Sequence, residues 1–76
     1  IDYVKIDGDF IININNDEKD RAFVNSIVTL AKELKITTIA EFVENEEIVE
    51  ILNDLEIDYY QGFHIGKPTN EFISFK

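Results

Sequence analysis

The sequence predicts an α/β fold in which short parallel strands are covered by amphipathic helices. The main observation is the stretch at residues 36–44, a β-branched apolar segment that runs into one carboxylate, Glu41, and reaches a second, Glu44, three residues later. A near-continuous apolar run of this kind is typical of a buried parallel strand. Helical patterns flank it on both sides, and this alternation of strand and helix indicates βαβ units with parallel pairing.

A first strand is expected at residues 1–7, where β-forming residues precede a break at Asp7-Gly8-Asp9. Alternation places Val4 and Ile6 on one face of this strand and Lys5 on the other. A lysine in such a position is commonly a surface residue whose alkyl stem lies along apolar neighbours. The functional alternative is a cation that orients a water molecule or an anionic group at the end of the strand.

Two helices are expected between the strands. The first begins at residue 17 or 18, after the N-cap signal Asn15-Asn16-Asp17, and ends near Lys35. The second begins after Asn45. The apolar residues predicted to face the sheet are Phe23, Ile27, Leu30, Ala31 and Leu34 in the first helix, and Ile48, Ile51, Leu52 and Leu55 in the second.

A third short strand is expected at residues 59–63, with Gln61 and a glycine near its end. A loop at residues 64–68 follows, and Thr69-Asn70-Glu71 is predicted to open a last helical turn. His64 is the only histidine in the chain, so no second histidine could complete a metal site with it, and we interpret it as a loop or packing residue.

Each predicted strand carries a polar residue near its end: Lys5, Glu41 and Gln61. Because parallel strands share one direction, their carboxyl ends meet at one edge of the sheet, and α/β folds keep their chemistry at that edge. We therefore expect an ammonium, a carboxylate and an amide to converge there. Glu44 is either part of this site or an acid that stabilises the start of the second helix.

Composition limits the possible functions. The chain has 76 residues, of which 45% are apolar, and no cysteine, which excludes disulfides and thiolate metal sites. No apolar run is long enough for a membrane span and no signal peptide is recognisable, so we expect a soluble, cytoplasmic protein without membrane contact. The formal net charge of −9 disfavours polymeric nucleic acid as a partner, although acids can hold divalent cations that in turn hold a small phosphorylated ligand.

Three segments in order, DYVKIDGDFI, IAEFVENEE and YYQGFHIGKP, resemble the carboxyl-terminal part of an EAL domain, the bacterial cyclic di-GMP phosphodiesterase module. The resemblance covers essentially the whole chain. It implies that residues 1–76 form the last three strand–helix units of a TIM-like (β/α)8 barrel, an incomplete barrel that is inactive alone. It also implies association with the missing barrel half or homo-oligomerisation.

The resemblance further implies hydrolysis of cyclic di-GMP to the linear dinucleotide with Mg²⁺ or Mn²⁺, most of whose ligands lie outside this chain. By motif position, Lys5 matches the family's active-site lysine that contacts the catalytic water. Glu41 matches a metal-associated acid also proposed as general base, and Gln61 a polar residue near the water and phosphate. Glu44 matches a position linked to the architecture of the site and its neighbouring loop.

The sequence departs from the family pattern where Phe42 replaces the usual glycine and Phe63 a common tyrosine. The signature Glu-Ala-Leu, the metal-binding Asn, a further Glu and the Asp pair belong to earlier strands and are not in this chain. One alternative is therefore a degenerate EAL domain that binds cyclic di-GMP or a protein partner without cleavage. Another is a free-standing α/β interaction protein with no nucleotide role.

Overall fold

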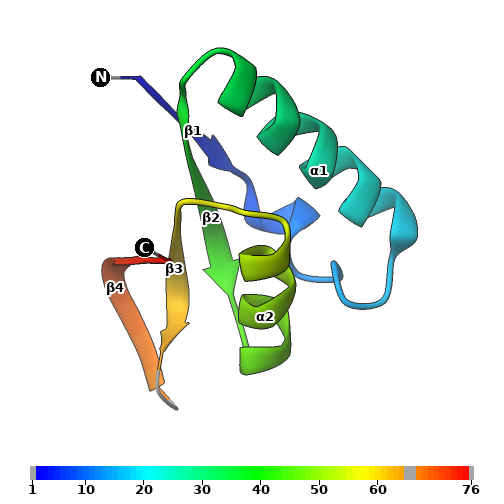
Figure 1. Ribbon diagram of the computed structural model, residues 1–76. Helices are drawn as coiled ribbons and strands as arrows, with labels where there is room; N and C mark the ends of the chain where they lie inside the picture. The colour runs from blue at the N-terminus through cyan, green and yellow to red at the C-terminus, as the bar shows by residue number, and fades with distance from the viewer. Residues whose placement is uncertain (1, 65–66, 76) are drawn as a thin grey trace.

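The computed structural model describes residues 2–64 and 67–75, with the side chains of 64 and 67–70 excepted. It consists of a four-stranded sheet with two helices, α1 and α2, on one face (Figure 1). The elements follow the order β1 (Tyr3–Ile6), a 3₁₀ turn (Gly8–Phe10), α1 (Glu18–Glu33), β2 (Thr37–Val43), α2 (Glu46–Asp54), β3 (Tyr59–His64) and β4 (Lys67–Ser74). The predicted α/β class is confirmed.

Both helices begin and end where local chemistry dictates. The Asp17 carboxylate caps α1 by accepting hydrogen bonds from the backbone N–H groups of Lys19 (2.8 Å) and Asp20 (3.2 Å), and Asn45 caps α2 in the same way. Each helix ends in a left-handed residue, Lys35 after α1 and Glu56 after α2. The hydrogen bonds around these two residues form Schellman motifs, which turn the chain directly into the following segment.

The face that α1 turns toward the sheet differs from the prediction. Val24, Val28 and Ala31 are the buried positions, whereas three of the predicted residues, Phe23, Leu30 and Leu34, are exposed. The α1 sequence contains two adjacent apolar stripes, and the one with the smaller side chains packs against the strands. In α2 the prediction is confirmed: Ile48 and Leu52 are fully buried, and Ile51 and Leu55 pack against the core.

The first three strands are parallel, as predicted. β1 pairs with β2 through Lys5 opposite Ile39, and β2 pairs with β3 through Ile39 opposite Tyr59. A register shift between Ala40 and Val43 interrupts the second pairing. The main hydrophobic core lies between the helices and the sheet and is built from isoleucine, leucine and valine together with Ala40 and Tyr60.

The predicted final helical turn is wrong. Residues 67–74 instead form β4, which pairs antiparallel with β3 through Tyr60 opposite Ile73 and Gln61 opposite Phe72. The edge of β3 offers unpaired backbone groups, and satisfying them outweighs the local preference of Thr69-Asn70-Glu71 for a helix start. The predicted loop now comprises the end of β3, the start of β4 and residues 65–66, which lie outside the described residues.

Phe42 lies directly over Gly8. Its backbone is left-handed (φ 57°), a conformation that costs a non-glycine residue roughly 1–2 kcal/mol, and its side chain is 70% exposed. A Cβ added at Gly8 would lie 2.6 Å from the Cβ of Phe42, so the glycine makes room for the aromatic side chain. The two positions are therefore coupled.

We expect Gly8→Ala to lower the free energy of unfolding by about 1–3 kcal/mol because it overpacks the contact with Phe42. In a Phe42→Gly background most of this cost should disappear, since the obstructing atoms are gone. Urea unfolding of the two single variants and the double variant measures the coupling. Additive effects of the two substitutions would contradict the contact.

Candidate functional site

The three residues predicted to converge lie on one face of the sheet. Alternation from the paired residues Lys5, Ile39 and Tyr59 puts Glu41 and Gln61 on that same face, each two residues further along its strand. It is the face without helices, opposite α1 and α2 (Figure 1). Lys5 is exposed, whereas Glu41 and Gln61 are half-buried.

The positions along the strands differ in detail from the prediction. Lys5 is the last residue but one of β1, Glu41 lies two residues before the end of β2, and Gln61 is the third residue of β3. Lys5 and Glu41 therefore lie toward the carboxyl ends of their strands, whereas Gln61 lies in the first half of β3, which continues to His64 and pairs with β4. Glu44 lies outside β2, exposed, immediately before the N-cap of α2.

Side chains of the two outer strands meet on the helix-free face. The ammonium of Lys5 on β1 lies 5.4 Å from the centre of the Phe72 ring on β4. Ile39 lies on the same face, and although no helix covers it there, it is only 6% exposed. Neighbouring side chains therefore cover the middle of this face.

Sequence analysis missed three hydrogen bonds between Thr38 and Asp58 that join the amino ends of β2 and β3. The Asp58 carboxylate accepts hydrogen bonds from the backbone N–H of Thr38 (2.9 Å) and from its hydroxyl (3.2 Å), and the backbone N–H of Asp58 donates to that hydroxyl (3.1 Å). Thr38 is buried, so these bonds satisfy groups that water cannot reach. These hydrogen bonds hold β2 and β3 together at the end opposite the candidate site.

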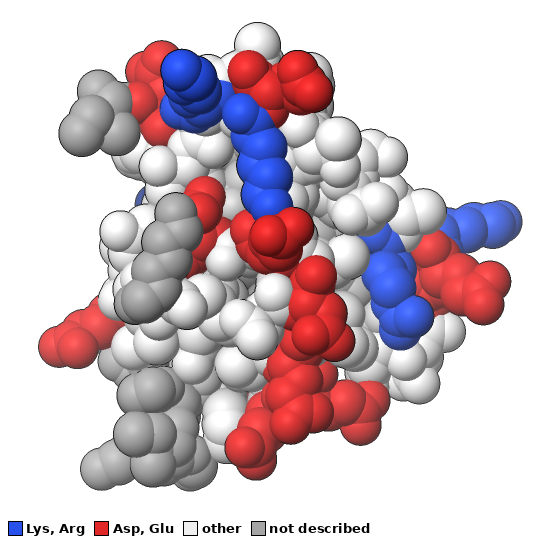
Figure 2. All heavy atoms as spheres, viewed as in Figure 1, with Lys and Arg blue, Asp and Glu red and all other residues white. Residues whose placement is uncertain are grey.

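Acidic side chains gather over α2. Residues 44–54 contain five acids and no lysine or arginine, and Figure 2 shows an unbroken acidic area where α2 lies in Figure 1. This area lies on the helix-covered side. The side chain of Asn15 donates a hydrogen bond to Glu47 there (2.7 Å), which ties the turn before α1 to the start of α2.

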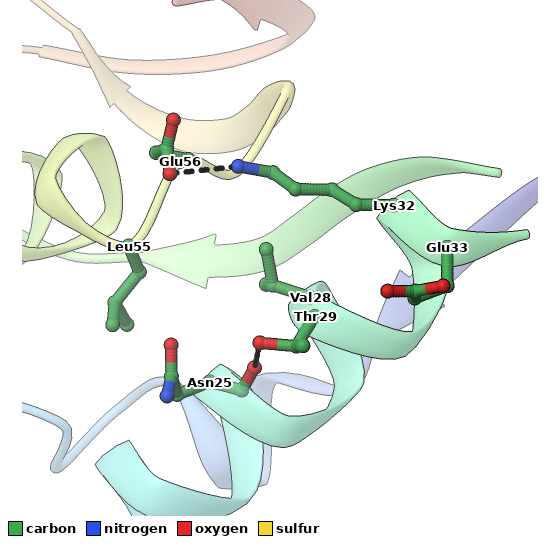
Figure 3. Close-up of a pocket in the computed structure, with 7 residues that line it drawn as sticks. All are labelled: Asn25, Val28, Thr29, Lys32, Glu33, Leu55 and Glu56. Atoms are coloured by element: carbon green, nitrogen blue, oxygen red, sulfur yellow. Dashed lines mark hydrogen bonds and ion pairs between the residues drawn. The ribbon is translucent and has the colours of Figure 1, made fainter. Parts of the chain in front are cut away.

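A groove between α1 and the segment after α2 is the pocket drawn in Figure 3. Its lining residues are Asn25, Val28, Thr29, Lys32, Glu33, Leu55 and Glu56. The Lys32 ammonium and the Glu56 carboxylate lie 2.8 Å apart across it. None of the candidate residues lines this groove, and an ion pair as exposed as this one contributes little to stability.

The ionisable groups of the described residues do not form a metal site by themselves: they contain no group of three or more His, Asp or Glu side chains placed to hold a metal ion. Glu41 offers a single carboxylate on the helix-free face, whereas a hard divalent cation needs about six oxygen ligands. Burial raises the pKa of the Tyr60 phenol, but this residue belongs to the core on the helix side. None of the described helices is long and apolar enough to cross a membrane.

Comparison with known proteins identifies the family. The sequence profile of the EAL domain matches residues 1–68. The chain belongs to the EAL domain family. Its curated relatives include the cyclic di-GMP phosphodiesterases PdeB of Shewanella oneidensis, 48% identical over 90% of this chain, and PdeF of Escherichia coli, 52% identical over 88%. This EAL chain spans only 8% and 9% of the lengths of those two relatives.

Solved EAL structures share the fold of this EAL chain. The PaMucR phosphodiesterase in complex with c-di-GMP matches with a TM-score of 0.79 and 38% identity, over 90% of this chain and 28% of that one. An EAL domain protein from Listeria monocytogenes matches with a TM-score of 0.79 and 36% identity, over 92% and 28%. The predicted relationship to an EAL domain, a TIM-barrel fold, is thus confirmed, and residues 69–76 lie beyond the family match.

Proposed function

We propose that this chain is the carboxyl-terminal part of a cyclic di-GMP phosphodiesterase domain, and that the complete domain hydrolyses cyclic di-GMP to linear pGpG in bacterial second-messenger signalling. The observation that carries the proposal is the EAL family match over residues 1–68, whose curated relatives are cyclic di-GMP phosphodiesterases. The common face of Lys5, Glu41 and Gln61 supports it, because residues that act on one phosphate must share one surface.

Each of the three side chains has a role that its chemistry suits. The Glu41 carboxylate would take a proton from the attacking water as general base. The Lys5 ammonium would steady that water and the negative charge that develops on the phosphate. Gln61, with a donor and an acceptor on one amide, would orient the water or a phosphate oxygen without adding charge. Glu44 would act through the conformation of the loop that precedes α2.

A divalent cation, Mg²⁺ or Mn²⁺, would supply charge neutralisation at the phosphate in the complete domain. The described residues of this chain do not fit such an ion alone, since they contain no group of three or more acidic or histidine side chains placed to hold it. We therefore propose that most ligands come from earlier parts of the domain. On this proposal the 76-residue chain is inactive by itself.

We further propose that this chain associates with the remainder of its barrel. Two features support this. The exposed stripe of α1, formed by Phe23, Leu30 and Leu34, is apolar, and β1 pairs with another described strand on one edge only. Both surfaces would be covered by a preceding strand–helix unit in a complete domain, and self-association is the expected result if that unit is absent. A cytoplasmic location remains a prediction.

One observation favours a second candidate, a degenerate EAL domain that binds cyclic di-GMP without cleaving it. Phe42, next to Glu41, adopts a left-handed backbone in the position where the family pattern has glycine. The strained backbone and the large side chain of Phe42 directly follow Glu41, the proposed general base, and can therefore displace its carboxylate. Such a domain would keep the ligand-binding face and lose the alignment needed for water attack.

The test is an assay of the complete protein that contains this chain, with cyclic di-GMP and Mg²⁺ or Mn²⁺. Formation of pGpG that stops on addition of a chelator supports the phosphodiesterase. Calorimetric binding of cyclic di-GMP without product supports the degenerate receptor. Neither turnover nor binding, in a folded protein, would reject both and leave the interaction protein as the remaining candidate.

A further inference from the structure

Glu41 and Phe42 form a β-bulge near the carboxyl end of β2. They lie within the register shift of the β2–β3 pairing, opposite a single residue of β3, Gln61. Ala40, before the bulge, and Val43, after it, both belong to the core on the helix side. Residues three apart in a regular strand face opposite sides, so the extra residue of the bulge accounts for this. Bulges commonly redirect a side chain next to an active site.

The bulge also lies beyond the regular pairing with β1. The last pair between β1 and β2 joins Ile6 to Ala40, so the ladder ends immediately before Glu41. Among the described strands, neither bulge residue has a partner in the register of β1 or of β3. Strand pairing alone therefore does not fix the place of Glu41 relative to β1, the strand that carries Lys5.

The contact between Phe42 and Gly8 supplies the missing connection. Gly8 is buried and begins the 3₁₀ turn that follows β1, and a Cβ added to it would lie 2.7 Å from the Cγ of Phe42. The Gly8 carbonyl accepts hydrogen bonds from the backbone N–H groups of Ile11 (3.0 Å) and Ile12 (2.9 Å), so the turn is a fixed support. A left-handed backbone such as that of Phe42 (φ 57°) persists only where the surrounding structure holds it.

This contact involves only neighbouring strands of the chain. β2 pairs with β1 on one edge and with β3 on the other. The outer edges of β1 and β3, where the other strands of a closed barrel would pair, take no part in it. The contact between Gly8 and Phe42 is thus independent of β4, and we expect it to be kept in the complete domain.

We propose that Phe42 is a positioning residue for Glu41. Its side chain, held against Gly8, fixes the bulge relative to β1 and thereby sets where the Glu41 carboxylate lies with respect to Lys5. Such placement matters because a displacement of about 1 Å can lower a rate about 10²-fold. This role is the opposite of that in the degenerate-receptor candidate, where Phe42 displaces Glu41. The proposal rests on the proposed function only in taking Glu41 as a group that acts on the substrate.

A double-variant cycle in the complete protein tests the contact without an assay of activity. The readout is the ¹³C signal of the Glu41 carboxyl group, assigned through Glu41→Gln. Gly8→Ala should shift this signal, because the added methyl group displaces Phe42. In a Phe42→Gly background the same substitution should leave the signal where Phe42→Gly alone places it. A Gly8→Ala shift of equal size in both backgrounds, or no shift in either, overturns the proposal.

The unaltered protein provides a test that does not depend on the folding of Gly8→Ala. Nuclear Overhauser effects should connect the Hα protons of Gly8 with the ring protons of Phe42, and Phe42→Tyr should retain them. Their absence from the complete protein overturns the proposal.

Kinetics with cyclic di-GMP tests the effect on the reaction. Phe42→Gly should lower kcat about 10- to 100-fold and leave KM within about twofold, because the side chain places a reacting group and has no assigned contact with the ligand. Phe42→Tyr, which keeps the ring, should restore kcat. Lys35→Gly is the matched control: Lys35 has a similar left-handed φ of 58° but precedes the amino end of β2, so kcat should be unchanged.

The remaining outcomes separate this proposal from the proposed function. An unchanged or increased kcat in Phe42→Gly overturns the positioning role, and an increase would show that Phe42 displaces Glu41. A raised KM with unchanged kcat also overturns it, since Phe42 would then contact the ligand. Absence of turnover in the unaltered protein would count against the proposed phosphodiesterase, while the Glu41 carboxyl signal still decides the role of Phe42.

Discussion

Glu41→Gln in the complete protein should lower kcat for cyclic di-GMP hydrolysis by about 10²–10⁴-fold, the usual contribution of a positioned general base. The amide keeps the shape of the side chain but can neither accept the proton of water as a base nor offer an anionic ligand to a cation. Because Glu41 is half-buried and has no ion pair among the described residues, the free energy of unfolding should change little.

Glu50→Gln is the matched control for this experiment. Glu50 is an exposed acid on α2, on the helix-covered side, and its removal changes the net charge by the same amount. It should leave kcat and KM at the values of the unaltered protein. Activity of Glu41→Gln within about threefold of the unaltered protein would remove Glu41 from the mechanism.

Gly62→Ala should destabilise the protein by about 3 kcal/mol or more. Gly62 has a φ of +135°, which side-chain-bearing residues rarely adopt, and an added Cβ would collide with the carbonyl oxygen and the amide nitrogen of Val43. Both atoms are backbone, so the collision can be relieved only if β2 and β3 move apart at their register shift. Chemical unfolding followed by circular dichroism measures the loss.

Gly62→Ala should reduce the catalytic activity as well as the stability of the protein. Gly62 directly follows Gln61 and pairs with Val43, two residues after Glu41, so separation of the strands would displace the amide relative to the carboxylate. At a temperature where Gly62→Ala is still folded, kcat should be reduced. The Gly8→Ala variant provides the comparison. Its loss of stability should be relieved by Phe42→Gly, which removes the obstructing side chain, whereas no side-chain substitution can relieve the collision of Gly62→Ala with the backbone of Val43. An unchanged unfolding midpoint would contradict the collision.

Much of the fold could be predicted from local signals. The N-caps Asp17 and Asn45, together with the helical periodicity that follows each, defined the first helix to within two residues at each end and the start of the second helix. The apolar run at the centre of the chain located β2, and alternation with helices predicted parallel pairing. These signals are reliable because they act between residues close in sequence, through caps, periodicity and backbone preferences.

The buried face of α1 could not be predicted in the same way. Phe23 is followed by Val24, and Leu30 by Ala31, so two apolar stripes with the same period lie side by side on one helix. Periodicity cannot choose between them. The space between α1 and the sheet decided in favour of the smaller residues, and the larger ones remain exposed in the described chain.

By itself, the sequence determined the order of the first three strands and the two helices, the parallel pairing of those strands and the acidic surface. It predicted Lys5, Glu41 and Gln61 at one edge of the sheet, and strand pairing puts the three on one face of it. Only the tertiary structure decided that residues 67–74 form a strand and that Phe72 reaches Lys5. Both depend on strand pairing and side-chain contacts between segments far apart in the chain. No local pattern encodes them, since their free energy comes from hydrogen bonds and contacts that exist only once the sheet has formed.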